Sequence, residues 1–149
     1  MTFTIRPVSA NDRTAWHALW EAYCAFYRTT LDSAISEKTW QRLIDPTSPI
    51  DGLLVASETG EPLGFCNYVC HPHTWSDRTV CYLEDLFVAP AGRRLGIGTA
   101  LIEALRTQGI AQGWGRIYWV TDHDNVDAQA LYDKVADRTA HVRYQIKLQ

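Results

Sequence analysis

Short apolar runs separated by turn signals fill much of the chain. Residues 52–58 (GLLVASE) and 63–71 (LGFCNYVCH) flank the sequence Thr-Gly-Glu-Pro, a combination that predicts a β-hairpin. Residues 140–148 (AHVRYQIKL) alternate between apolar and polar positions, which is typical of a strand with one buried face. The pattern predicts strands at residues 3–8, 52–58, 63–71, 79–88, 116–121 and 140–148.

Helices are expected at residues 11–28, 36–44, 96–112 and 126–135. The first has apolar and aromatic residues at spacings of three and four, from Ala15 to Tyr27, so most of this stripe belongs in the core. Tyr27, near the helix end, is also a candidate for lining a substrate pocket. Asp124 or Asn125 can cap the last helix. Antiparallel strands followed by a β-α-β-α-β succession predict one mixed α/β domain over residues 1–149.

Charge and composition argue against several partners. The formal net charge is −3 and the pI is about 5.9, so no positive field holds nucleic acid, and a cationic or neutral substrate is favoured. No apolar stretch is long enough to span a bilayer, and the N-terminus lacks a signal-peptide pattern. We therefore expect a cytoplasmic protein with reduced cysteines and no membrane partner. The cysteines and histidines at Cys66, Cys70, His71, His73 and Cys81 lack zinc-site spacings, so no metal is expected.

The sharpest local feature is the segment 93–99 (RRLGIGT), between an expected strand and an expected helix. Glycines at the start of a helix let backbone N–H groups approach an anion, and the helix dipole adds partial positive charge. The segment therefore predicts a seat for a pyrophosphate. A P-loop would need Gly-Lys-Ser/Thr, and a dinucleotide fingerprint would need a third glycine shortly after Gly98. Both are missing, which leaves the pattern Arg-x-x-Gly-x-Gly.

This pattern resembles the acetyl-CoA loop of the GNAT superfamily of N-acetyltransferases. Upstream, residues 82–88 (YLEDLFV) resemble the family's central strand, especially in diamine and polyamine acetyltransferases. Downstream, residues 125–134 (NVDAQALYDK) resemble its Asn-x-x-Ala-x-x-Leu-Tyr-x-Lys helix. Many relatives continue with a Leu-Gly-Phe turn, whereas this chain has residues 135–140 (VADRTA), which look like the small fungal histone, polyamine and D-amino-acid acetyltransferases. The resemblance covers the whole chain and is tightest over 79–135.

The resemblance implies a central mixed sheet of six to seven strands flanked by about four helices. It also implies acetyl-CoA as co-substrate and a homodimer. A splay or bulge in the central strand would leave a backbone N–H at Phe87 or Val88 free to bind the thioester carbonyl. The residues expected to bind the cofactor are Leu86, Phe87, Val88, Arg93, Arg94, Gly96, Ile97, Gly98, Thr99, Asn125, Tyr132 and Lys134.

The implied reaction is direct attack of an amine on the thioester. An alkylammonium has a pKa near 10, so it must lose a proton first, and by resemblance Glu84 is the expected base. Asp85 follows Glu84 on the strand and is expected on the opposite sheet face, so at most one of the two faces the thioester. Tyr132 is expected to protonate the leaving sulfur. Trp75, in the loop 72–78, joins Tyr27, Glu84 and Asp85 as a candidate for contacting the acceptor.

Several alternatives stay open at this point. The acceptor can be a polyamine or diamine, a free amino acid or a lysine side chain. A non-catalytic acyl-CoA-binding sensor or assembly module would keep Arg93, Gly96 and Gly98 but has no use for Glu84 or Tyr132. A dinucleotide-binding domain is a more distant alternative, because one β-α-β unit cannot hold both halves of NAD.

Overall fold

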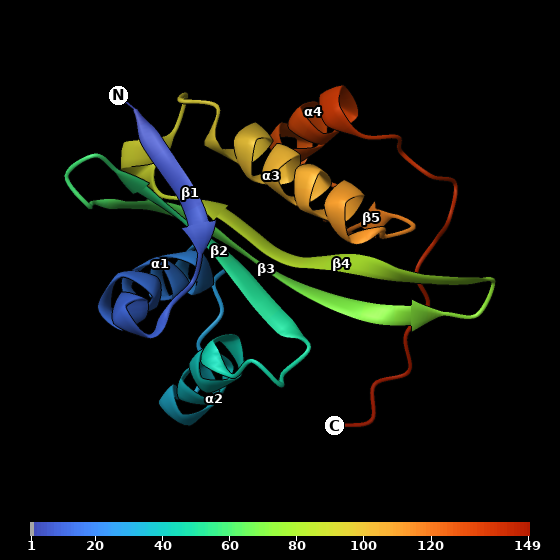
Figure 1. The fold of residues 1–149 in the computed structure, drawn as a ribbon, viewed down its shortest axis with the longest axis horizontal. Coiled ribbons are helices and arrows are strands. Elements are labelled where there is room, and N and C mark those ends of the chain that lie inside the picture. Colours follow the sequence, from blue (N-terminus) through green and yellow to red (C-terminus); the bar gives the residue numbers. More distant parts are fainter. Residues whose placement is uncertain (1) are drawn as a thin grey trace.

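A twisted mixed sheet with two helices on each face forms the centre of the structure (Figure 1). The computed structural model describes residues 2–149. The strands follow one another in the order β1-β2-β3-β4-β5; all neighbours are antiparallel except β4 and β5, which are parallel. The elements are β1 (Phe3–Pro7), α1 (Arg13–Phe26), α2 (Ser33–Ile44), β2 (Ile50–Ser57), β3 (Pro62–His73), β4 (Ser76–Val88), α3 (Ile97–Gln112), β5 (Ile117–Tyr118) and α4 (Val126–Val135).

The mixed α/β class and the four helices are confirmed, but the sheet has five strands in residues 2–149 rather than six to seven. The segment 140–148, predicted as a final strand, has no secondary structure and is exposed. The segment predicted at 116–121 shortens to the two residues of β5. Alternation marks a segment that can form a strand, but a strand forms only where its backbone finds a ladder partner.

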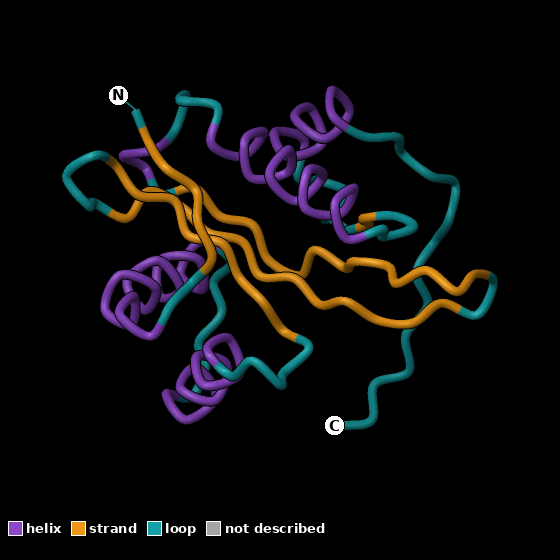
Figure 2. Tube along the Cα trace, viewed as in Figure 1, coloured by secondary structure: helices purple, strands orange, loops and turns teal. Residues whose placement is uncertain are grey.

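Several boundaries also differ from those predicted. Strands β3 and β4 are longer than expected, so the predicted loop 72–78 is reduced to a tight turn that carries Trp75. Figure 2 shows this hairpin projecting past the other strands. Helix α2 begins at Ser33 rather than Ser36, because the carboxylate of Asp32 caps it by accepting a hydrogen bond from the Ala34 N–H at 2.9 Å.

Two apolar clusters hold the helices to the sheet, one on each face. On one face, Leu101 and Leu105 of α3 pack against Leu83 of β4. On the other face, Trp16 of α1 packs with Phe65 and with Phe87 of β4. Strand β4 therefore supplies core residues to both faces.

No helix within residues 2–149 is long and apolar enough to cross a membrane. Over the same residues, no group of three or more His, Cys, Asp and Glu side chains is arranged to hold a metal ion. All four cysteines are free thiols.

Candidate active site

The pairing of β4 with β5 is very short. It consists of Cys81 opposite Ile117 and Tyr82 opposite Tyr118. Beyond this point β4 continues to Val88 with β3 as its partner, whereas the chain after Tyr118 leaves the ladder. The last part of β4 therefore has one free edge, and a gap opens between it and the segment that follows β5.

Two backbone N–H groups of β4 point into this gap. The N–H of Ala89 donates to the carbonyl of Leu63 on the β3 side at 2.9 Å. Because N–H directions alternate along an antiparallel strand, Phe87 also points its N–H toward β3, while Leu86 and Val88 point theirs away from it. Of the two donors expected from the sequence, Val88 thus faces the gap and Phe87 does not.

A β-bulge lies at Glu84. Asn67 of β3 pairs with Asp85 and Tyr68 pairs with Leu83, so Glu84 is an extra residue without a partner position. Leu83 and Leu86 both pack on the α3 side, although residues three apart on a regular strand face opposite sides. The alternation of side chains is therefore broken at Glu84, between Leu83 on the α3 side and Asp85, which contacts Tyr23 of α1 on the other side. The expectation that Glu84 and Asp85 face opposite sides assumed an unbroken strand, and the bulge removes that assumption.

The two carboxylates have different surroundings. Asp85 is largely buried and accepts hydrogen bonds from the Tyr23 hydroxyl at 2.7 Å and from Asn67 Nδ2 at 3.0 Å. Burial raises the pKa of Asp85, and the two hydrogen bonds oppose that change. Glu84 is more exposed; partial burial and the negative charge of Asp85 raise the pKa of its carboxyl group, while Arg143 lowers it. Asp85 is thus a carboxyl group held in place by two hydrogen bonds, and Glu84 is a more exposed carboxyl group whose pKa is also raised.

Aromatic side chains surround this pair. Tyr27, at the end of α1, packs edge-on against Tyr23 with ring centroids 5.0 Å apart. Burial raises the pKa of Tyr27, and the negative charges of Asp122 and Asp85 raise it further. Burial also raises the pKa of Tyr132, with a smaller contribution from Tyr27. Residues from α1, β4, α4 and the segment after β5 therefore lie within electrostatic reach of one another.

The N-terminus of α3 has the features of an anion site. Gly96 has a left-handed backbone with φ of 76°, and Arg94 has one with φ of 65°. The first helical hydrogen bond runs from the Ala100 N–H to the Gly96 carbonyl, so the N–H groups of residues 97–99 have no helical acceptor. The first turn has no acidic residue, and no side chain caps it. Arg93 and Arg94 are exposed and form no ion pair within residues 2–149.

Other predicted site residues have mainly structural positions. The side chain of Ile97 is buried in the core, so only its backbone can face an anion. Asn125 caps α4 by accepting a hydrogen bond from the Ala128 N–H at 3.3 Å, and Lys134 lies exposed on the same helix. Trp75 is 92% exposed at the tip of the β3–β4 turn. At roughly 3.3 Å per residue, it lies about 30 Å along the strand from Asp85, so it does not border the two carboxylates.

Three residues that surround the two carboxylates were not singled out from the sequence. Tyr23 was included in the core stripe of α1, and nothing in its spacing marks its hydroxyl as a partner of Asp85. Asn67 was detectable as the only amide in the apolar run 63–71. Asp122 follows a strand that was predicted to be longer than it is, and nothing in the sequence marks its charge as one that raises the pKa of Tyr27.

Comparison with known proteins identifies the fold. Residues 16–136 match the acetyltransferase (GNAT) family. The chain belongs to this family. It is 37% identical over 142 residues to the D-amino-acid N-acetyltransferase HPA3 of Saccharomyces cerevisiae, which covers 95% of this chain and 88% of that protein. The family prediction is confirmed, and the yeast relative fits the predicted small fungal subgroup.

Solved GNAT structures share this architecture. An aminoglycoside acetyltransferase from an uncultured soil metagenomic sample, HMB0005, superposes with a TM-score of 0.81 at 26% identity, with 100% of each chain covered. The acetyltransferase AAC(6')-Iy, in complex with a bisubstrate analogue of CoA, superposes with a TM-score of 0.82 at 19% identity, with 99% of each chain covered. Enzymes of the GNAT family use acetyl-CoA.

If the start of α3 binds the CoA pyrophosphate, Gly96→Val should abolish most of the protection that CoA gives against unfolding. A ligand at a hundredfold excess over its Kd adds about 2.7 kcal/mol to the free energy of unfolding. Valine disfavours the left-handed backbone and displaces the N–H groups, so we expect at least tenfold weaker binding, or about 1.4 kcal/mol less protection. The measurement is thermal unfolding with and without CoA.

Gly113→Val is the matched control. Gly113 ends the same helix with φ of 75° and, like Gly96, has nothing within 4 Å of an added Cβ. Both variants should lose similar intrinsic stability, but Gly113→Val should keep its CoA protection. Equal protection in the two variants would contradict the assignment of residues 93–99.

Proposed function

We propose that the protein is an acetyl-CoA-dependent N-acetyltransferase that transfers an acetyl group to the primary amine of a small cationic molecule. The observation that carries the proposal is the free edge of β4 after Tyr82, which leads from two carboxylates to the uncapped start of α3. Membership of the GNAT family supports the same reaction. A screen of amines with acetyl-CoA, following release of free thiol, is the direct test.

The order of groups along β4 suggests how the co-substrate lies. The anion site at α3 follows Val88 in the chain, and the carboxylates precede Leu86. An extended pantetheine arm can therefore pair with the edge of β4 as a peptide strand would. In this arrangement the Val88 N–H binds a pantetheine carbonyl, and the Leu86 N–H, closer to the carboxylates, binds the thioester carbonyl. A positioned N–H donor of this kind contributes roughly 3 kcal/mol to stabilising the oxyanion.

Glu84 and Asp85 have different roles toward the acceptor amine in this proposal. Asp85, held by Tyr23 and Asn67, attracts the cationic substrate without needing to move. Glu84, with a raised pKa and greater exposure, takes the proton from the ammonium group directly or through water. The names of the yeast relative and of the aminoglycoside acetyltransferases indicate amine acceptors that suit such an anionic site. A small amine, such as an amino acid or a polyamine, fits it better than a lysine on a bulky protein.

Tyr132 is the proposed acid that protonates the leaving sulfur. Its ring packs edge-on against Trp119 with centroids 5.3 Å apart, and burial raises the pKa of its hydroxyl. The hydroxyl therefore stays protonated at neutral pH, as a general acid must.

A non-catalytic acyl-CoA-binding module would also explain the anion site. It would not explain a half-buried aspartate held by two hydrogen bonds beside a second carboxyl group with a raised pKa. We further propose a cytoplasmic homodimer as the working form, and the four free thiols support a reducing compartment.

Glu84→Gln should change the pH dependence of kcat/KM. In the wild type, kcat/KM rises as pH increases through the raised pKa of Glu84, because the base is then ionised. The variant lacks this limb and depends on the small fraction of free amine, which grows until the substrate pKa near 10. We expect a loss of about a hundredfold at pH 7 that shrinks at alkaline pH.

Asp85→Asn serves as the comparison in the same assay. It removes a fixed charge rather than the base, so KM for a cationic amine should rise at every pH and the shape of the profile should stay. A pH-dependent loss in Asp85→Asn with none in Glu84→Gln would exchange the two roles. An equal loss at all pH values in both variants would mean that neither Glu84 nor Asp85 is the base.

Tyr132→Phe removes a hydroxyl and leaves the ring to pack against Trp119. A general acid contributes about 10²–10⁴-fold, or about 3–5 kcal/mol of barrier, so the loss should appear in kcat and hardly in CoA affinity. An acyl-thioester with a better leaving thiol should partly rescue the variant. Retention of most of the kcat with acetyl-CoA would refute the role.

A further inference from the structure

Two cysteines occupy directly opposite positions on neighbouring strands. Cys70 of β3 pairs with Cys81 of β4 in the antiparallel ladder. The N–H of Cys81 donates to the Arg116 carbonyl on the β5 side at 3.0 Å, so the backbone groups of Cys81 point away from β3. The two cysteines are therefore a non-hydrogen-bonded pair, whose Cα atoms are about 4.5 Å apart and whose side chains are close. A disulfide spans Cα separations of about 4.4–6.8 Å, so this pair is within reach of one.

The two thiols interact and differ in exposure. Both side chains pack in the apolar cluster on the α3 face of the sheet, where Cys81 is fully buried and Cys70 is half-buried. Burial raises the pKa of both thiols. A hydrogen bond from the Cys81 thiol lowers the pKa of Cys70, and the same contact raises the pKa of Cys81 further. Cys70 is thus the first of the two to become a thiolate.

The other two cysteines are not placed to join this pair. Cys66 lies four residues before Cys70 on β3, about 13 Å along the strand, and its ladder partner is Leu86. Cys24 belongs to α1 and packs against the cluster on the opposite face of the sheet. Cys70 and Cys81 are therefore the two thiols that a disulfide can connect without rearranging the fold.

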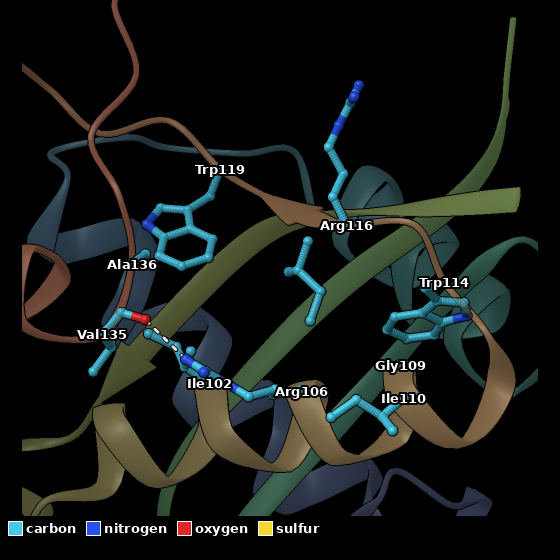
Figure 3. A pocket seen from close by; sticks show the side chains of 10 residues that line it. Ile102, Arg106, Gly109, Ile110, Trp114, Arg116, Trp119, Val135 and Ala136 are labelled. Carbon is cyan, nitrogen blue, oxygen red and sulfur yellow. Dashed lines mark hydrogen bonds between the residues drawn. The ribbon is translucent and has the colours of Figure 1, made fainter. Parts of the chain in front are cut away.

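Cys70 is the more accessible end of the pair. The pairing of β3 with β2 ends at Val69, so beyond it the second edge of β3 pairs with no strand within residues 2–149. On the other side, Cys81 lies opposite Ile117 of β5. The groove of about 260 Å³ between α3 and β5, shown in Figure 3, is lined by neither cysteine. A small oxidant therefore meets Cys70 before Cys81.

We propose that Cys70 and Cys81 are a redox-active pair that closes into a cross-strand disulfide by exchange with a low-molecular-weight disulfide. The Cys70 thiolate attacks one sulfur of the small disulfide, forms a mixed disulfide and expels one thiolate. Cys81, once deprotonated, attacks the Cys70 sulfur and expels the second thiolate. The two protons lost by the protein thiols end on the two expelled thiols. The protein pair is oxidised by two electrons, and the small disulfide is reduced by the same two.

The new bond would form where β5 leaves the sheet. Cys81 directly precedes Tyr82, the last residue of β4 that pairs with β5. The bond would join β3 and β4 across the base of their projecting hairpin and close a loop around residues 71–80, which restricts the unfolded chain. Because the pKa of both thiols is raised, exchange is slow. In a reducing compartment the pair stays open and responds to sustained oxidation.

The first test maps the bond in the full chain after incubation with oxidised glutathione. Free thiols are then alkylated, and the protein is digested with trypsin without reductant. Cleavage after Arg78 separates the two cysteines, so the wild type should yield peptides 43–78 and 79–93 joined together and released by dithiothreitol.

Cys66→Ala is the matched control, because Cys66 lies in the same tryptic peptide as Cys70. This variant should keep the joined peptides, and Cys70→Ser should lose them. Four alkylated cysteines in the incubated wild type, or joined peptides that persist in Cys70→Ser, would overturn the proposal.

The second test follows the order of the two steps and the effect on stability. Cys81→Ala should stop at the mixed disulfide, with one glutathione on Cys70, because no second thiol displaces it. The oxidised wild type should unfold about 5 °C above the reduced protein, whereas Cys70→Ser treated in the same way should not change. Cys81→Ala without the adduct, or an oxidised wild type with the Tm of the reduced protein, would contradict the exchange between these two thiols.

Discussion

The ladder between β4 and β5 stops after Tyr82 and Tyr118, and the proposed site depends on the gap that follows. A parallel pair that continued to Val88 would use the N–H groups of Leu86 and Val88 within the sheet. Because the ladder between β4 and β5 ends, these donors stay available, while residues of β4 belong to the apolar clusters on both faces of the sheet. Tyr132 of α4 packs against the apolar cluster that includes Leu83 of β4.

The bulge at Glu84 determines how the two carboxylates of the proposed site are arranged. Without the extra residue, the two carboxylates would face different sides of the sheet, and only one would reach the acceptor. With it, Asp85 reaches Tyr23 of α1 and Asn67 of β3, while Glu84 stays close enough for the charge of Asp85 to raise the pKa of its carboxyl group. One anion can then hold a cation while the other exchanges a proton.

The parts of this account that follow from local sequence were predictable. The glycines and arginines of 93–99 indicate an anion site because the geometry is contained in one loop, and Asn125 indicates a helix start for the same reason. The bulge, the Tyr23–Asp85 contact and the position of Trp75 depend on register between distant segments, which a single sequence does not display. The tail 140–148 shows the limit of a local pattern: its residues alternate as in a strand, but the segment has no ladder partner in the structure and forms no strand.

The most direct test of the central claim is a crystal structure with acetyl-CoA bound. The account predicts the thioester carbonyl within hydrogen-bond distance of the Leu86 N–H, a pantetheine carbonyl on the Val88 N–H, and the pyrophosphate against residues 93–99. Acetyl-CoA bound elsewhere, or a β5 that pairs with β4 as far as Val88, would contradict it.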